Sequence, residues 1–283
     1  MDCNAPINIK KTTDRCSLKC LLWYKYGNSS CTVKNAADQL LITYDGESDV
    51  MFNSVNYNPV EVRIFKPSIH QFDGTKADAE IVIVHKGSNG GLLLCIPLLT
   101  STDANASTAT NLLNDIIKNS PGTDQTTSLN LSEFNLNFII PKSSYFSYTG
   151  TLPYNCDKTE YNYVVFPKNS LKVDNKTMKH LGNLIHDSYI PIHERKCYFN
   201  EMGTKTNGFS GDGQIYIDCQ PTGEEGEIIY KEHSYTKPMN LEWLYSFLYV
   251  IIGIIILWYS VKLLNFLFIF VNKMNQLKIE EKF

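Results

Sequence analysis

Short runs of β-branched and aromatic residues alternate with clusters of Gly, Asn, Ser and Pro along most of this chain. This alternation is typical of a mainly β domain. The runs predict strands at Leu40–Tyr44, Val60–Phe65, Ile81–His85, Leu92–Leu99, Phe134–Ile140 and Asn162–Phe166. Two stretches have helical periodicity instead, Thr108–Asn119 and Thr177–Ser188.

The C-terminal part has a different pattern. Trp243 to Val261 carries no formal charge, and the apolar run resumes at Leu263–Val271 after Lys262. Because roughly 20 apolar residues span a hydrocarbon core of about 30 Å, we expect one transmembrane or membrane-associated helix here. The expected organisation is a domain at 1–235, a juxtamembrane linker at 236–242, the membrane segment at 243–271 and a short polar tail at 272–283.

The N-terminus lacks the apolar core of a signal peptide, so we expect a single-pass, tail-anchored membrane protein. Lysines lie on both sides of the apolar segment, and they leave its orientation open.

The charge balance constrains the partners. The chain of 283 residues has a formal net charge of −3, so we expect no nucleic-acid partner, and a polyanion would need a local basic patch. Candidates for such a patch are Lys10, Lys11, Arg15, Lys19, Arg195 and Lys196. Ordinary solvated faces explain these residues equally well.

The chain has eight cysteines, Cys3, Cys16, Cys20, Cys31, Cys95, Cys156, Cys197 and Cys219. An even number fits a disulfide framework, while reduced core thiols are an equal alternative. Four asparagines, Asn28, Asn105, Asn130 and Asn175, stand in glycosylation sequons. Such matches arise readily by chance in an Asn- and Ser-rich chain.

The segment Ser68–His85, with the sequence S-I-H-Q-F-D-G-T-K-A-D-A-E-I-V-I-V-H, is the most informative part of the chain. Strand geometry places Glu80, Val82 and Val84 on one face. The segment resembles, without a gap, the α-carbonic anhydrase sequence S-E-H-x-x-D-G-x-x-x-x-A-E-L-H-L-V-H. In that family the histidine at the position of Val82 is the third zinc ligand, and an isopropyl group offers zinc no donor.

The resemblance places the other two ligands as H-x-H on the preceding strand. The corresponding region, Val60–Pro67, contains no histidine, and the first histidine of the chain is His70. The resemblance therefore implies that the zinc site is lost and that no other cofactor or catalytic residue replaces it. It also implies structural roles in the core for His70, Glu80 and His85.

A second block, Pro141–Cys156, resembles the family sequence L-P-x-x-x-x-Y-x-Y-x-G-S-L-T-T-P-P-C. The threonine that orients zinc-bound hydroxide in the enzymes is Pro153 here, which has no hydroxyl group. The next position is Tyr154, whose bulk would fill the substrate pocket.

A third block, Asn4–Ile9, resembles Q-S-P-I-N-I near the start of the family domain. Secreted members join a cysteine just before this phrase to the one that ends the second block. The resemblance therefore implies a disulfide between Cys3 and Cys156.

Taken together, the blocks imply an α-carbonic anhydrase-like fold, mainly β with a few helices and a central, twisted, mostly antiparallel sheet. They favour a protein without enzymatic activity. Inactive members with precedent are receptor ectodomains and the surface protein of poxvirus particles, which has the same plan and attaches virions to glycosaminoglycan. We therefore expect an attachment protein in a virion membrane that binds a cell-surface polysaccharide or protein. The alternatives are an accessory subunit of a membrane complex in a protist or organelle and, third, an active carbonate dehydratase.

Overall fold

The computed structural model describes residues 3–11, 14–16, 19–102, 107–156, 159–204 and 257–264. The chain divides into two units, Met1–Asp218 and Cys219–Phe283. The expected boundaries at 235, 242 and 271 lie outside the described residues. In the second unit, residues 257–264 are helical and exposed. No helix among the described residues is long and apolar enough to cross a bilayer, and most of the expected span 243–271 lies outside them.

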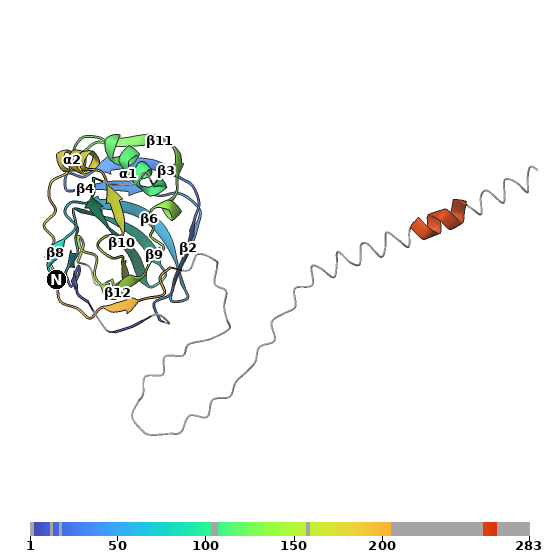
Figure 1. Ribbon diagram of the computed structural model, residues 1–283, viewed down its shortest axis with the longest axis horizontal. Coiled ribbons are helices and arrows are strands. Elements are labelled where there is room, and N and C mark those ends of the chain that lie inside the picture. Colours follow the sequence, from blue (N-terminus) through green and yellow to red (C-terminus); the bar gives the residue numbers. More distant parts are fainter. Residues whose placement is uncertain are drawn as a thin grey trace, which may run out of the picture. The chain divides into compact units, whose positions relative to one another are not determined.

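The first unit is built on a large, mixed sheet (Figure 1). Its main path follows the order β11-β3-β4-β6-β9-β10-β13-β12-β15. Most neighbours are antiparallel, while β13 and β14 pair with β10 in parallel. The strands on this path, in chain order, are β3 (Ser29–Asn35), β4 (Gln39–Thr43), β6 (Val55–Phe65), β9 (Ala79–Gly87), β10 (Gly90–Thr100), β11 (Thr126–Phe134), β12 (Tyr145–Gly150), β13 (Tyr161–Val165) and β15 (Tyr198–Asn200).

Smaller elements complete the unit. Strands β2 (Leu22–Tyr26), β5 (Ser48–Phe52) and β14 (Leu171–Val173) branch from the main path. Strands β1 (Asn8–Ile9), β7 (Gln71–Phe72) and β8 (Thr75–Lys76) form a separate small sheet. The helices are α1 (Thr108–Lys118), α2 (Asn175–Leu184) and the one-turn 3₁₀ helix η1 (Leu136–Phe138).

The central strands β9 and β10 are buried on both faces, which separates two hydrophobic clusters. Ile81, Ile83 and Leu94 belong to the larger cluster, which also takes in the buried faces of α1 and α2. Val82 and Cys95 point to the smaller cluster, together with the N-terminal segment and β13. The alternation read from the sequence at Ile81–His85 therefore sorts side chains between two cores rather than between a core and solvent.

The sequence prediction of a strand over Phe134–Ile140 is wrong for most of its length. β11 ends at Phe134, and the chain then turns into η1. The Asn135 side chain accepts a hydrogen bond from the Asn137 N–H at 3.0 Å, which begins the 3₁₀ turn. Leu136, Ile139 and Ile140 are buried at helical spacing. The apolar run therefore follows the period of a helical turn rather than the two-residue period of a strand.

The Asp73-Gly74 pair makes a two-residue turn between β7 and β8. Both residues have positive φ, 48° and 78°, which is the conformation that a tight hairpin of this length needs. This turn returns the chain directly to β9 and places His70 against Glu80.

Candidate functional site

The position of the expected third zinc ligand lies in the middle of the sheet. Val82 is fully buried on β9, with Arg63 of β6 opposite it on one side and Cys95 of β10 on the other. Period-two geometry places Glu61 and Phe65 on the same face of β6 as Arg63. Any H-x-H pair directed toward Val82 would have to use these three positions, and none is histidine.

A cation–π and ion-pair cluster occupies this face instead. The Arg63 guanidinium lies over the ring of Tyr154, 3.8 Å from its centroid. Its Nε donates to Glu61 Oε1 at 2.6 Å, and its Nη1 donates to Gln39 Oε1 at 2.8 Å. The Phe65 ring stacks against the Tyr154 ring, with the two centroids 6.2 Å apart. A positive guanidinium, a valine and a phenylalanine do not fit a zinc ion, which needs neutral imidazole or anionic donors.

Tyr154 is the residue that closes this cluster. It follows Pro153, where the resemblance places a hydroxyl that orients the zinc-bound oxygen. Burial raises the pKa of Tyr154, so the phenol stays neutral. Its hydroxyl is buried without a hydrogen-bond partner among the described residues, which shows that the ring is held by packing and by Arg63 rather than by a polar anchor.

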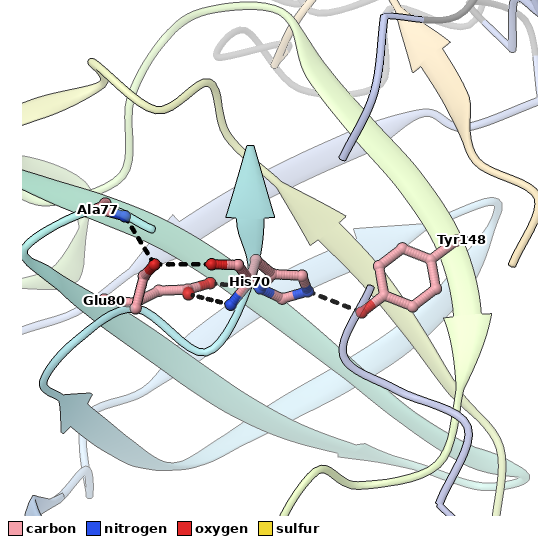
Figure 2. A network of polar contacts seen from close by, with 5 residues as sticks. His70, Ala77, Glu80 and Tyr148 are labelled. Atoms are coloured by element: carbon pink, nitrogen blue, oxygen red, sulfur yellow. Dashed lines mark hydrogen bonds and ion pairs between the residues drawn. The ribbon is translucent and has the colours of Figure 1, made fainter. Parts of the chain in front are cut away.

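Glu80 and His70 form a second buried network on the same side of β9 (Figure 2). His70 Nδ1 lies 2.6 Å from Glu80 Oε1, and the His70 backbone N–H donates to Glu80 Oε2 at 3.0 Å. On the other side of the ring, His70 Nε2 lies 2.7 Å from the Tyr148 hydroxyl. An imidazole that carries its proton on Nδ1 donates to Glu80 and accepts from Tyr148, so both nitrogens are satisfied.

Ser68 closes the loop behind this network. Its hydroxyl donates to the His70 carbonyl at 2.7 Å and accepts from the Ala77 N–H at 2.8 Å. The motif S-x-H with Glu80 twelve residues after the serine is therefore a self-contained hydrogen-bonding unit.

His70, Glu80 and Cys95 place one potential ligand atom each within 4.8 Å of one another. Burial and the nearby Glu80 raise the pKa of Cys95 well above its usual range, so the thiol keeps its proton. The carboxylate already accepts from both His70 donors. A complete set of hydrogen bonds, rather than an open coordination site, accounts for the group.

His85 faces the larger cluster. Its Nδ1 lies 3.1 Å from the Leu92 carbonyl and its Nε2 lies 2.7 Å from the Tyr26 hydroxyl. Burial lowers the pKa of His85 to about 4. The ring is therefore neutral at pH 7, donating to Leu92 and accepting from Tyr26.

A disulfide and two hydrogen bonds join the N-terminal block, Asn4–Ile9 with the preceding Cys3, to the second block, Pro141–Cys156. Cys3 and Cys156 form a disulfide, as the resemblance implied. Asn4 N–H donates to Thr151 Oγ1 at 3.2 Å, and Thr151 N–H donates to Asn4 Oδ1 at 2.8 Å. A second disulfide joins Cys16 to Cys20.

The remaining described cysteines are unpaired. Cys31 and Cys95 are buried and Cys197 is half-buried, while Cys219 lies outside the described residues. Both earlier alternatives, a disulfide framework and reduced core thiols, therefore hold for different cysteines.

The candidate basic residues are brought together only in part. The segments 14–16 and 198–200 lie side by side at the β15 edge of the sheet. Four of the candidates contact acidic side chains at distances of 3.3–4.0 Å; the pairs are Lys10 with Glu194, Arg15 with Glu201, Arg195 with Glu160, and Lys196 with Asp14. Lys11 and Lys19 are exposed nearby in sequence. The surface therefore alternates in sign.

Sequence reasoning missed Arg63, Tyr148 and Cys95. One available signal was the charged pair Glu61 and Arg63 inside an otherwise β-branched and aromatic strand. Tyr148 belongs to the second block, Pro141–Cys156, but no local pattern connects it with His70, which is 78 residues away.

Comparisons with solved structures find α-carbonic anhydrases. The enzyme from Photobacterium profundum aligns with a TM-score of 0.61 and 16% identity, over 70% of this chain and 88% of that chain. The enzyme from Thermovibrio ammonificans, solved with sulfanilamide, gives 0.61 and 15%, over 70% and 86%. A structure of dioscorin complexed with ascorbate gives 0.60 and 17%, over 71% and 86%. No family model and no curated protein matches the sequence. At such identities the likeness shows an α-carbonic anhydrase-like fold and nothing further.

Proposed function

We propose that the chain, which has an α-carbonic anhydrase-like fold and no histidine at strand positions 61, 63, 65 and 82, is a membrane-anchored binding protein without enzymatic activity. The most specific form of the proposal is a virion surface protein that attaches particles to host-cell glycosaminoglycan. The observation that carries the first part is the Arg63–Tyr154 cluster, which fills the zinc side of the sheet with a cation and two aromatic rings.

The chemistry of hydration supports this conclusion. Carbonic anhydrases need a metal that lowers the pKa of bound water to about 7. Among the described residues, the strand positions 61, 63, 65 and 82 supply no imidazole, and Pro153 supplies no hydroxyl. The two buried histidines are fully used in hydrogen bonds, so neither is placed to accept a substrate proton.

The membrane part rests on the apolar segment 243–271. Within it, residues 257–264 are helical, and the Lys262 ammonium lies 4.3 Å from the Trp258 ring centroid. A lysine folded along its own helix toward an aromatic ring is typical of an interfacial position. The attachment part rests on the basic residues beside β15. Exposed ion pairs contribute only about 0–1 kcal/mol each. The exposed Lys10, Arg15 and Lys196 side chains can therefore turn from their carboxylate partners toward sulfate groups at little cost.

The test for activity uses the full-length protein purified in detergent. We expect zinc well below one equivalent after incubation with the metal, and carbon dioxide hydration equal to that of buffer. One tightly bound equivalent of zinc together with measurable hydration would overturn the proposal.

The test for attachment measures binding of the same protein to cultured cells. We expect soluble chondroitin sulfate or heparan sulfate to compete, and binding to fall as salt rises. The triple variant Lys10→Glu/Arg15→Glu/Lys196→Glu should lose binding, while Lys34→Glu, at an exposed position of β3, should keep it. Recovery of a stoichiometric membrane complex without cell binding would favour the accessory-subunit alternative.

A further inference from the structure

A polar groove lies on the side of the sheet opposite Val82, between α1 and the second half of β11. β11 pairs with β3 from Thr126 to Leu129, and the register then shifts before Phe134 meets Ser29. Asn130 and the residues after it therefore leave the ladder. Together with one face of α1 and with η1 they border a hollow of about 510 Å³; its lining comprises Thr108, Asn111, Leu112, Asp115, Asn119, Asn130, Leu131, Glu133 and Phe138.

Two of the amides and both carboxylates in this lining have hydrogen-bonding capacity that the other described residues do not use. Among the described residues, the side chains of Asn111, Asp115, Asn130 and Glu133 have no hydrogen-bond or ion-pair partner within the protein. Carboxylates accept only, whereas an amide both donates and accepts. The lining can therefore bind a set of neighbouring hydroxyl groups, each of which donates one hydrogen bond and accepts another.

Phe138 gives the groove an aromatic wall. Its side chain is 39% exposed, which is unusual for a ring beside the core residues Leu136 and Ile139. A second hollow of about 430 Å³ adjoins the first, and Thr108 and Phe138 border both. An exposed ring between two hollows can stack on the C–H face of a pyranose while each hollow holds one end of the ligand.

The charge of the lining selects among ligands. No lysine, arginine or histidine lines the first hollow, and its two carboxylates repel sulfate and phosphate groups. A purely apolar ligand would remove water from four polar side chains without replacing their hydrogen bonds. The hollow lies within the range of ligand pockets, roughly 300–1,000 Å³.

We propose that this groove binds an uncharged saccharide, with one hexose-sized ring stacked on Phe138 and its hydroxyls bonded to Asn111, Asp115, Asn130 and Glu133. The second hollow receives the neighbouring sugar ring. The groove uses a different face and a different chemistry from the basic surface beside β15, so this inference stands or falls independently of the proposed function.

The experiment uses full-length protein made in bacteria, so that Asn130 carries no N-glycan. Binding is measured on immobilised neutral oligosaccharides of glucose, galactose, mannose and N-acetylglucosamine, with chondroitin sulfate and a random peptide library as competing classes. Saturation-transfer NMR then measures contact with the bound sugar. We expect at least one neutral saccharide to bind at millimolar concentration, equally at low and high salt because no charge is involved.

Phe138→Ala and Asn130→Ala should each weaken this binding by about tenfold or more, as loss of a stacking or convergent contact does. Tyr189→Ala is the matched control, because Tyr189 is an aromatic residue that is 89% exposed and outside the groove. Four outcomes would overturn the proposal: no neutral sugar binds, the sugar binds equally to Phe138→Ala, only peptides bind in the groove, or chondroitin sulfate binding depends on Phe138. The first three outcomes do not bear on zinc content or on the basic surface, whereas the fourth would also move the chondroitin sulfate site away from that surface.

Discussion

At the residue scale, His70 and His85 are both fully buried, but their hydrogen-bond partners differ in kind. His70 lies against a carboxylate, whereas His85 lies between a carbonyl and a tyrosine hydroxyl. Tyr26, which faces His85, has its own pKa raised well above the usual range by burial, so no charge near the ring compensates for protonation. His85 is therefore the residue whose titration opposes the folded state.

We predict an acid-dependent loss of stability from His85. Its pKa is about 4 in the folded protein and about 6.5 in the unfolded chain, so the unfolded state binds the proton first as pH falls. The contribution is complete above about pH 6.5 and is lost between pH 6.5 and 4, by about 3 kcal/mol. Denaturant titrations at several pH values give the free energy of unfolding as a function of pH. Between pH 6.5 and 4 this free energy should fall less steeply for His85→Gln than for the wild type, and parallel pH profiles would contradict the prediction.

The carboxylate of Asp45 loses its contribution to stability in a more acidic pH range than His85 does. Hydrogen bonds from Ser30 and Ser29 lower the pKa of Asp45 to about 2. The stability that depends on Asp45 is therefore lost only below about pH 4, where its unfolded-state value lies. The difference between wild type and His85→Gln should already be complete at that point.

At the scale of elements, β12 depends on close approach of the N-terminal segment. A Cβ atom on Gly150 would lie 2.7 Å from the Ala5 Cβ and 3.1 Å from Asn4 Oδ1, which accepts from Thr151. The glycine is therefore needed, because Ala5 and Asn4 occupy the space that a side chain at this position would fill.

We predict that Gly150→Ala lowers the free energy of unfolding by about 1–3 kcal/mol, since overpacking at a closed contact forces backbone shifts. Gly122→Ala is the matched control, because a Cβ there lies no nearer than 3.6 Å to a flexible glutamine side chain. Equal denaturation midpoints for the two variants would contradict this account of the contact between Gly150 and the N-terminal segment.

Local patterns predicted the elements that bury a regular face. The helix over Thr108–Asn119 is confirmed as α1, because its apolar spacing and the Ser107 cap both act within one turn. β11 was not predicted, since Thr126–Phe134 is mostly polar and pairs at the edge of the sheet. Its place is determined by β3, far away in sequence.

The candidate site was predictable only where a block carried it. Val82, Pro153 and the Cys3–Cys156 pair could be read from aligned motifs. The contact between Arg63 and Tyr154 could not, because it depends on how β6 and the loop after β12 meet across the sheet.

On the scale of the whole molecule, the two disulfides among the described residues close loops of very different length. Cys3–Cys156 spans 153 residues and Cys16–Cys20 spans four. In the chain-entropy model the first restricts the unfolded state by about 5 kcal/mol and the second by about 2 kcal/mol.

We therefore predict that Cys3→Ser/Cys156→Ser lowers the free energy of unfolding more than Cys16→Ser/Cys20→Ser does, by about 3 kcal/mol in this model. Thermal unfolding of each double variant with and without dithiothreitol provides a second measurement, because the reductant then opens only the disulfide that the variant retains. Dithiothreitol should therefore destabilise the Cys16→Ser/Cys20→Ser variant more. Equal destabilisation by the two double variants would show that strain or residual structure outweighs loop entropy.

The burial of β9 on both faces also limits how the sequence could change in descent. Val82→His alone would enclose an imidazole beside Arg63 and Cys95, and an unpartnered buried polar group costs about 1–3 kcal/mol. A zinc-binding strand here would therefore also need changes at positions 63 and 65 and in the loop at Tyr154, and none of these changes binds a metal by itself. The packing on this face of the sheet therefore favours functional change at the outer surface over the creation of a metal site in the sheet.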